Sequence, residues 1–485
     1  MSSVLLLGNS GDDLGTGKGG EEQLPCCSRW LGRVVDVEEA REQVGFAVPM
    51  VVTNMAYYGI PLVSVMFLGH LGNVHLAGAT LGNSWATVTG YAFVMGLSGA
   101  LETLCGKAYG ARLYRMLGLY LQASFIMSAA ASTLISVFWY FTEPLLLFLR
   151  QDPDVSHAAA VFVRAQIPAL FAFGFIHCLL RYLQTQSVVL PLLFCSVAPF
   201  VLQVGLAHLL VNVFGLGLAG AAAAASVTFW ISCLMLFGYV LLSEKFSETW
   251  RGFSTEAFTY VLVTVKLATP SAIMVCLELW AFELLVLIAG LLPNPTVSTP
   301  LIAMCASTEA ITCMVAVGFS ATVSTRVSNE IGAGNVDRAR NAVSVTLKLS
   351  VFLAIFFVLL LGFGHNLWAR LFSGSSMIVS EFADITPLMM VSIVLDSAQG
   401  VLSGVSRGCG WQHLAAMTNL VAYYVIGMPL AILFAFKLKF YAKGLWMGLI
   451  CGVAWQACSM LVITVRTKWS ELAEAMQEEK ATYVA

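Results

Sequence analysis

The sequence predicts an all-α polytopic membrane protein with twelve transmembrane helices, arranged as two pseudo-symmetric six-helix lobes. The first observation is composition: 59% of the 485 residues are hydrophobic and only 11% are charged. Soluble domains carry roughly 25% charged residues, so these charges are too few to cover a soluble surface of this size. The second is that apolar residues form long blocks, such as residues 119–141, and one helical crossing takes about 20 residues. The third is that these blocks lack two-residue alternation, which excludes a transmembrane β-barrel.

The chain is expected to contain five segments, and each of the two lobes is expected to hold six spans. The segments are a cytosolic disordered tail (1–43), the amino-terminal lobe (44–242), a cytosolic inter-lobe linker (243–258), the carboxy-terminal lobe (259–466) and a charged, helical cytosolic tail (467–485). The spans are expected to begin near Val44, Leu76, Met116, Ala158, Val188, Leu216, Phe258, Pro300, Ala342, Ser380, His413 and Leu445.

Basic residues set the expected orientation, because loops on the cytoplasmic side of a membrane carry an excess of Lys and Arg. Loops expected on the side of the amino terminus hold Lys107, Arg112, Arg115, Lys245, Arg251, Arg326, Arg338, Arg340 and Arg407. Loops expected on the opposite side hold Arg150, Arg370, Lys437, Lys439 and Lys443. The excess favours a cytosolic amino terminus, and an even number of spans then places both termini in the cytosol. The net charge of −2 gives no indication of nucleic-acid binding.

The two halves of the chain repeat each other. A shift of 222 positions brings Gly96 onto Gly318 and Gly110 onto Gly332, and also aligns Ser98, Thr103 and Ala111 with Ser320, Thr325 and Ala333. Near the start of each half, a shift of 221 aligns Pro49 with Pro270. Six spans separate the copies, an even number, so the repeats are expected to run parallel, related by an axis along the membrane normal.

Five segments resemble the multidrug and toxic compound extrusion (MATE) family, in particular its eukaryotic plant-type members. They are VMFLGHLG (65–72), LETLCGKAYGA (101–111), CLELWAFEL (276–284), STRVSNEIGAGN (324–335) and LDSAQGVLSGVSRGCGWQ (395–412). Two positions depart from the family pattern: Lys107 stands where Gln is usual, and Ser64 stands where prokaryotic relatives have an acidic residue. The resemblance implies an outward-facing V shape, an acidic pair in the carboxy-terminal lobe, and a location in the plasma membrane or the vacuolar membrane.

Carboxyl groups at membrane depth are the main candidates for function. A charged side chain at the bilayer centre costs about 2.5–3.5 kcal/mol on insertion scales, and loss of water favours the protonated form of a carboxyl group. Glu278 lies near the middle of the seventh expected span and Asp396 about midway along the tenth. Both are expected to couple transport to protons or cations, and the resemblance implies the same pair. The structural alternative is a permanently neutral Glu278 hydrogen-bonded to a neighbouring helix.

Further candidates concern the substrate path and helix bending. Glu283 and Glu309 are expected to contribute to a cation path, with a structural role as the alternative, whereas Glu102 is expected to have a solvated or salt-bridged structural role. Tyr57, Asn54, Asn83 and Trp280 are expected to line the path, since aromatic faces attract organic cations. Pro270 removes a backbone hydrogen bond, so the seventh span is expected to bend there. Most of the 12 cysteines are scattered singly through apolar spans and are expected to be small packed hydrophobic residues, whereas Cys26 and Cys27 precede the first span.

These observations predict a secondary active efflux transporter that exchanges external protons, or alternatively Na⁺, for small organic substrates. The resemblance implies organic cations, alkaloids, flavonoids or other xenobiotics and secondary metabolites. No cofactor beyond the coupling ion is expected, and the expected partners are the small-molecule substrate and membrane lipids; nucleic acid is excluded and a monomer is favoured. Two other classes remain open, a flippase of the same superfamily for lipid or lipid-linked substrates and a membrane-embedded enzyme. The flippase would need a cationic cavity for pyrophosphate, and the enzyme a catalytic motif such as His-Glu-x-x-His, which the sequence lacks.

Overall fold

The structure is a computed structural model that describes residues 36–69, 71–372 and 374–484. Within these ranges the chain is helical and contains no β-strand. Twelve helices in the described ranges are long and apolar enough to cross a membrane, which confirms the predicted fold class. Large apolar side chains such as Phe148, Leu242 and Phe363 lie almost fully exposed on the outside of the bundle, where lipid would cover them.

Six spans form the amino-terminal lobe, and short helices connect some of them. The elements are α2 (Val37–Gly69), α3 (Asn73–Ala86), the π-helical segment η1 (Thr87–Tyr91), α4 (Ala92–Gly110), α5 (Tyr114–Tyr140), α6 (Thr142–Phe148), α7 (Pro153–Ala165), α8 (Ile167–Thr185), α9 (Leu190–His208), the π-helical segment η2 (Leu209–Val213) and α10 (Gly217–Leu242). The second span consists of α3, η1 and α4, and the fifth of α9 and η2.

The carboxy-terminal lobe has six spans as well, preceded by a 3-10 turn. The elements are η3 (Glu244–Phe246), α11 (Ala257–Ala289), α12 (Pro295–Ala333), α13 (Val336–Phe372), α14 (Ser376–Cys409), α15 (Gln412–Leu420), the π-helical segment η4 (Val421–Gly427), α16 (Met428–Ile432), the π-helical segment η5 (Leu433–Lys437), α17 (Tyr441–Arg466) and α18 (Trp469–Val484). Four of these, α15 to η5, form the eleventh span. The helix α18 confirms the predicted helical carboxy-terminal segment.

The predicted starts of the first and fourth spans differ most from the structure. The first helix begins at Val37 rather than Val44, so residues 37–43 of the predicted tail are helical; residues 1–35 lie outside the described ranges. The extra turns are stabilised because the Gln43 amide donates to the Ala342 carbonyl (3.1 Å) and accepts from the Thr346 hydroxyl (2.8 Å). The fourth span begins at Ile167 rather than near Ala158, because α7 ends just before Gln166 and forms a separate short helix.

The beginning of α2 is also held by polar contacts at the neighbouring carboxy-terminal lobe. Asp36 accepts hydrogen bonds from the Glu39 amide (3.3 Å) and from the Asn341 side chain (3.1 Å). Hydrogen bonds to the ionised form favour that form, so the contact with the Glu39 amide, followed by that with Asn341, lowers the pKa of Asp36. Arg326 on α12 forms ion pairs with Glu39 and Glu42. Amino-terminal residues of α2 therefore join the two lobes.

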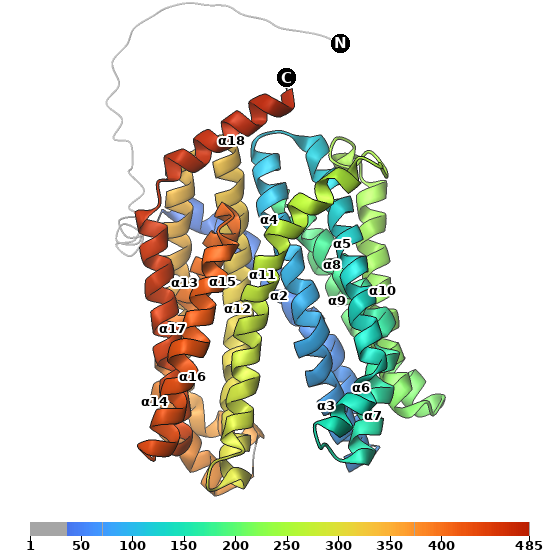
Figure 1. The fold of residues 1–485 in the computed structure, drawn as a ribbon, viewed down its shortest axis with the longest axis vertical. Helices are drawn as coiled ribbons and strands as arrows, with labels where there is room; N and C mark the ends of the chain where they lie inside the picture. The colour runs from blue at the N-terminus through green and yellow to red at the C-terminus, as the bar shows by residue number, and fades with distance from the viewer. Residues whose placement is uncertain (1–35, 70, 373, 485) are drawn as a thin grey trace, which may run out of the picture.

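The two lobes lie side by side and meet at the end of the molecule that carries α18, which we call the α18 end (Figure 1). Toward the opposite end the helices of the two lobes diverge in the same view. Each lobe has its own apolar core: one centres on residues such as Leu117, Ile176 and Tyr182, the other on residues such as Phe382 and Trp446. The resulting shape agrees with the V expected from the family resemblance.

Contacts at the α18 end reflect the sequence repeat. A methyl group on Gly110 of α4 would overlap the Asn329 carbonyl of α12, and one on Gly332 of α12 would overlap the Lys107 carbonyl of α4. Lys107 and Asn329 are themselves related by the shift of 222 positions. The absence of a side chain at both glycines lets the two backbones approach. The predicted repeat therefore appears as a pair of equivalent contacts across the lobe interface.

Candidate functional site

Three carboxyl groups of the carboxy-terminal lobe come together from three helices. Glu278 lies on α11, Glu309 on α12 and Asp396 on α14. Asp396 and Glu309 are buried, with 5% and 3% of their surfaces exposed, whereas Glu278 retains partial exposure. Asp396 interacts electrostatically with both Glu278 and Glu309. The structure thus groups the predicted coupling pair with a third carboxyl group that had been predicted to lie on the substrate path.

Polar side chains surround this acidic cluster, defined as Glu278, Glu309 and Asp396. The Ser392 hydroxyl donates to Glu309 Oε2 (3.0 Å), and the Trp446 indole donates to the same hydroxyl (3.2 Å). The Gln399 amide is within hydrogen-bonding reach of Glu278. Since buried polar groups need partners, Ser392 and Gln399 serve as partners for Glu309 and Glu278.

Two further groups complete the surroundings of the acidic cluster. The Cys313 thiol, one turn beyond Glu309 on α12, interacts electrostatically with all three carboxyl groups, and so does the Tyr423 hydroxyl on η4. Tyr423 is buried, and its hydroxyl has no hydrogen-bond partner among the described residues. The role of a small packed hydrophobic residue, predicted for most of the cysteines, does not describe Cys313, which lies near three carboxyl groups.

Cations do not neutralise the acidic cluster directly. Among the described residues, no ion pair involves Glu278, Glu309 or Asp396. Arg407 lies within electrostatic range of Glu278, but its guanidinium is held elsewhere, by Glu102 and Ser320 (3.1 and 2.7 Å). In the described part of the chain, no group of three or more His, Cys, Asp and Glu side chains is arranged to hold a metal ion.

Polar contacts fix the segment of α11 that bears Glu278. The Asn419 amide donates to the Met274 carbonyl (3.0 Å), and the Tyr424 hydroxyl donates to the Leu277 carbonyl (3.2 Å). Both donors lie on the eleventh span, and Tyr424 belongs to its π-helical segment η4. Segments of this type are frequent at functional sites. Pro270 lies inside α11, which continues as a helix through it, so bending at Pro270 stays a prediction.

The exposed face of α11 reaches toward the amino-terminal lobe. The Trp280 indole, 40% exposed, donates a hydrogen bond to the Val88 carbonyl in η1 (3.0 Å). Glu283 is exposed and interacts electrostatically with Tyr58 on α2. These two predicted substrate-path residues therefore lie between the lobes, outside the acidic cluster.

The predicted residues of the amino-terminal lobe divide into two groups. Asn54 and Asn83 are partly exposed, and each has one amide atom without a hydrogen-bond partner among the described residues. The prediction for Tyr57 was wrong: its ring is 4% exposed and packs on Phe229, and its hydroxyl shares a hydrogen bond with Ser232 (2.6 Å). Tyr57 belongs to the apolar core of the amino-terminal lobe, together with Ile60 and Phe229.

A buried ionic triad joins the lobes at the α18 end. Glu102 on α4 is fully buried and pairs with Arg181 on α8 (2.9 Å) and with Arg407 on α14 (3.1 Å). The predicted salt-bridged role of Glu102 is confirmed, but Arg407 had been assigned to a loop and lies inside the last turn of α14. Its burial was not evident from the sequence, because Arg407 had been counted among the basic residues that set the orientation.

Arg407 belongs to a segment that also matches a hydrolase pattern. Residues 404–408 read Gly-Val-Ser-Arg-Gly. In hydrolases such a serine stands on a sharp turn between a strand and a helix. Here Ser406 is buried within α14 and donates its hydroxyl proton to the Ser403 carbonyl (2.8 Å). The match therefore has no catalytic geometry.

Comparison with known proteins gives one consistent result. The MatE family model matches residues 49–209 and 270–433. Protein DETOXIFICATION 18 of Arabidopsis thaliana is 51% identical over 459 residues, which cover 95% of this chain and 97% of that protein. Protein DETOXIFICATION 16 of the same organism is 41% identical over 437 residues, covering 90% of each chain.

Solved structures agree with these relatives. The eukaryotic MATE transporter AtDTX14 superimposes with a TM-score of 0.88 at 35% identity, covering 92% of this chain and 99% of that chain. An outward-facing multidrug resistance MATE transporter shares the fold with a TM-score of 0.79 at 17% identity, covering 91% and 97%. The family model covers most of both repeats, and the relatives span almost the whole chain, so this protein belongs to the MATE family of membrane efflux transporters and is not an enzyme.

Proposed function

We propose that this transporter exports small organic substrates in exchange for protons, which bind at the acidic cluster. The observation that carries the proposal is the burial of Glu309 and Asp396 beside Glu278 with no ion-paired cation among the described residues. Carboxyl groups that share a buried site cannot all be charged at low cost. Proton uptake would therefore change the charge of this site during transport.

The charge of the cluster also suggests the substrate class. When deprotonated, the cluster attracts an organic cation, and the exposed Trp280 ring offers a face that would contribute about 0.5–2 kcal/mol to cation binding. Alkaloids and other cationic xenobiotics meet this description, whereas flavonoids would bind through their rings alone. A negative site disfavours the pyrophosphate of a lipid-linked sugar, which argues against the flippase alternative.

A transport cycle follows from competition between proton and substrate. Protons that enter from outside neutralise the cluster, and the cationic substrate then leaves because its attraction is lost. Reorientation of the lobes exposes the cluster to the cytosol, where the protons leave and the next substrate binds. Such exchange requires only that the two ligands favour different states or exclude each other.

Orientation and location belong to the same proposal. The loop 111–113 and the linker between α10 and α11 lie at the α18 end (Figure 1), and their Arg112, Lys245 and Arg251 support a cytosolic α18 end. Arg115, Arg326 and Arg407 do not count toward this argument, because all three lie within helices and form ion pairs. The chain is proposed to act as a monomer in the plasma membrane or the vacuolar membrane, with both termini cytosolic.

The test is export from proteoliposomes with a proton gradient and a sodium gradient imposed separately. Wild-type protein should export a fluorescent organic cation with the proton gradient, and Glu278→Gln should reduce this rate to that of protein-free liposomes. Glu381→Gln is the matched control, because Glu381 is an exposed carboxyl group on α14, the helix of Asp396. Undiminished export by correctly inserted Glu278→Gln would end the proposal, and export driven by the sodium gradient alone would reassign the coupling ion.

A further inference from the structure

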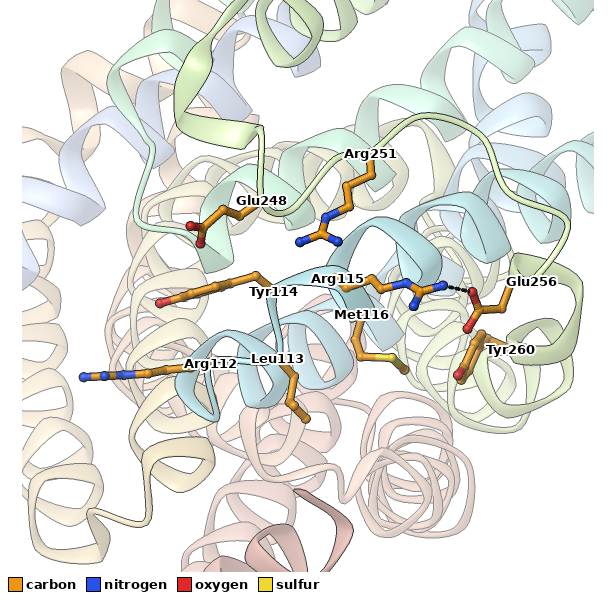
Figure 2. Close-up of a pocket in the computed structure, with 9 residues that line it drawn as sticks. All are labelled: Arg112, Leu113, Tyr114, Arg115, Met116, Glu248, Arg251, Glu256 and Tyr260. Carbon is orange, nitrogen blue, oxygen red and sulfur yellow. Dashed lines mark hydrogen bonds and ion pairs between the residues drawn. The ribbon is translucent and has the colours of Figure 1, made fainter. Parts of the chain in front are cut away.

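Two adjoining cavities lie where the beginning of α5 meets the linker that connects the lobes, and Figure 2 shows the residues that line the larger one. One has a volume of about 360 Å³ and lies against residues 112–116 and Tyr260; the other has about 280 Å³ and lies against Gln122, Thr249 and Ser254. Arg115 and Arg251 line both cavities. Glu278, Glu309 and Asp396 line neither cavity of this seam between α5 and the linker.

The balance of charge in the seam is positive. Arg112, Arg115 and Arg251 line it together with two carboxylates, Glu248 and Glu256. Arg115 forms an ion pair with Glu256, as the dashed line in Figure 2 marks. Among the described residues, no ion pair involves Arg112 or Arg251. Figure 2 shows the Arg251 guanidinium between Glu248 and Arg115, over the first turn of α5.

The backbone adds to this positive potential. The helix α5 has 27 residues, and its N-cap residue Leu113 provides no side-chain hydrogen bond to the first turn. Amide groups at an uncapped helix start point outward, and the helix dipole favours an anion there. Residues of that first turn, Tyr114 to Met116, line the larger cavity. The arginines and the first turn of α5 therefore border the same cavity.

The linker forms a firm wall of the seam. The Gln122 side chain, buried on α5, donates to the Gly252 carbonyl (3.0 Å) and accepts from the Ser254 amide (2.8 Å). A methyl group on Gly118 would overlap the Thr249 carbonyl, so the linker backbone lies directly on α5. Arg251 lies between Thr249 and Gly252, so these contacts fix the linker backbone from which the Arg251 side chain extends.

The neighbouring surface indicates what kind of anion fits. Phe253 in the linker and Phe258 and Leu262 on α11 are largely exposed, and in the chain they flank the cavity-lining residues Ser254, Glu256 and Tyr260. A soluble anion would make no use of this apolar surface, whereas acyl chains would cover it. Basic pockets between transmembrane helices are suited to phospholipid headgroups. We propose that the seam between α5 and the linker binds the phosphate headgroup of an anionic phospholipid, through Arg251, Arg115 and the start of α5.

The experiment is lipid retention by the purified full-length protein, measured by native mass spectrometry with phosphatidic acid and phosphatidylcholine as probes. Wild-type protein should retain phosphatidic acid in preference to phosphatidylcholine. Arg115→Gln/Arg251→Gln should bind phosphatidic acid about tenfold more weakly, the loss expected when charge-assisted hydrogen bonds are removed. Arg150→Gln, which removes an exposed arginine that lies outside both cavities, is the matched control and should bind like wild type.

Two further measurements complete the test: competition by inorganic phosphate, which distinguishes a soluble anion from a lipid headgroup, and a conservative variant of Arg251. Inorganic phosphate at millimolar concentration should not displace phosphatidic acid; equal competition would assign the seam to a soluble anion and overturn the lipid proposal. Arg251→Lys should retain most binding, and this conservative variant serves if the double variant fails to fold. No headgroup preference in the wild-type protein, or the same preference after both arginines are replaced, would also overturn the proposal.

Discussion

At the scale of single residues, the Ser392 hydroxyl holds two buried partners at once. It donates to Glu309 and accepts from the Trp446 indole. Ser392→Ala should lower the free energy of unfolding by about 1–3 kcal/mol, since a carboxyl group and an indole N–H lose their buried partner. Chemical unfolding in detergent measures this. Ser307→Ala on α12 is the control, because Ser307 is exposed and bonds only its own helix; equal destabilisation by both variants would contradict the role given to Ser392.

Asp396 is the residue where pH dependence should be most evident. Asp396→Asn removes one proton site from the acidic cluster, so the remaining carboxyl groups no longer repel its charge and should remain ionised to lower pH. The pH profile of proton-driven export should therefore move toward acid. Initial rates of export between pH 5 and pH 8 for wild type, Asp396→Asn and the control Glu381→Gln test this. Each loss of about 1.4 kcal/mol of interaction would move the profile by about one pH unit. A profile identical to wild type would remove Asp396 from the coupling mechanism.

At the scale of elements, the close contact of α4 with α12 leaves no room for side chains at two glycines. Gly110→Ala should destabilise the α18 end by about 1–3 kcal/mol, because the added methyl group meets the Asn329 backbone, which cannot rotate away. Gly332→Ala should have a similar effect at the equivalent position. Gly238→Ala on α10 has open space around it and should be neutral or slightly stabilising. Thermal unfolding in detergent compares the three variants, and a neutral Gly110→Ala would contradict the contact.

One hydrogen bond between the lobes joins the Trp280 indole on α11 to the Val88 carbonyl in the π-helical segment η1. Trp280→Phe keeps an aromatic ring but loses the hydrogen bond to the Val88 carbonyl. The contact should weaken by about 0.5–1.5 kcal/mol, which would shift the population of lobe arrangements up to about tenfold. Distance measurements between spin labels on the two lobes would report the change, with Trp230→Phe as a control, because the Trp230 indole bonds within the amino-terminal lobe.

At the scale of the whole molecule, the buried triad of Glu102, Arg181 and Arg407 joins three helices from both lobes. Removing Glu102 leaves two buried guanidinium groups without their carboxylate, so Glu102→Gln should cost about 3–5 kcal/mol of stability. The double variant Glu102→Gln/Arg407→Gln should recover part of this loss, because only Arg181 then lacks its partner. Unfolding of the single and double variants measures the interaction; purely additive effects would show that the two groups do not interact.

The fold was predictable because membrane spans depend on long apolar runs, which the sequence displays directly. The repeat was visible as well, since Gly96, Gly110, Gly318 and Gly332 recur at one spacing. In the site, Glu278 and Asp396 stood out as carboxyl groups at membrane depth. Cys313 and Tyr423 did not, because nothing in an apolar helix sequence shows which face meets a carboxyl group. The distance between residues on different helices depends on how the helices pack, and the sequence pattern along one helix does not show this.

The equivalence of the contacts Gly110–Asn329 and Gly332–Lys107 has a consequence for how such a chain can arise. An interface in which the same patch appears on both sides is the kind that two identical subunits form about a twofold axis. Joining two copies of a six-helix ancestor in one chain would preserve this interface and would allow the two copies to diverge in sequence. Glu278, Glu309 and Asp396 all belong to the second copy. The two copies would then have kept a shared interface while only the second acquired the acidic cluster.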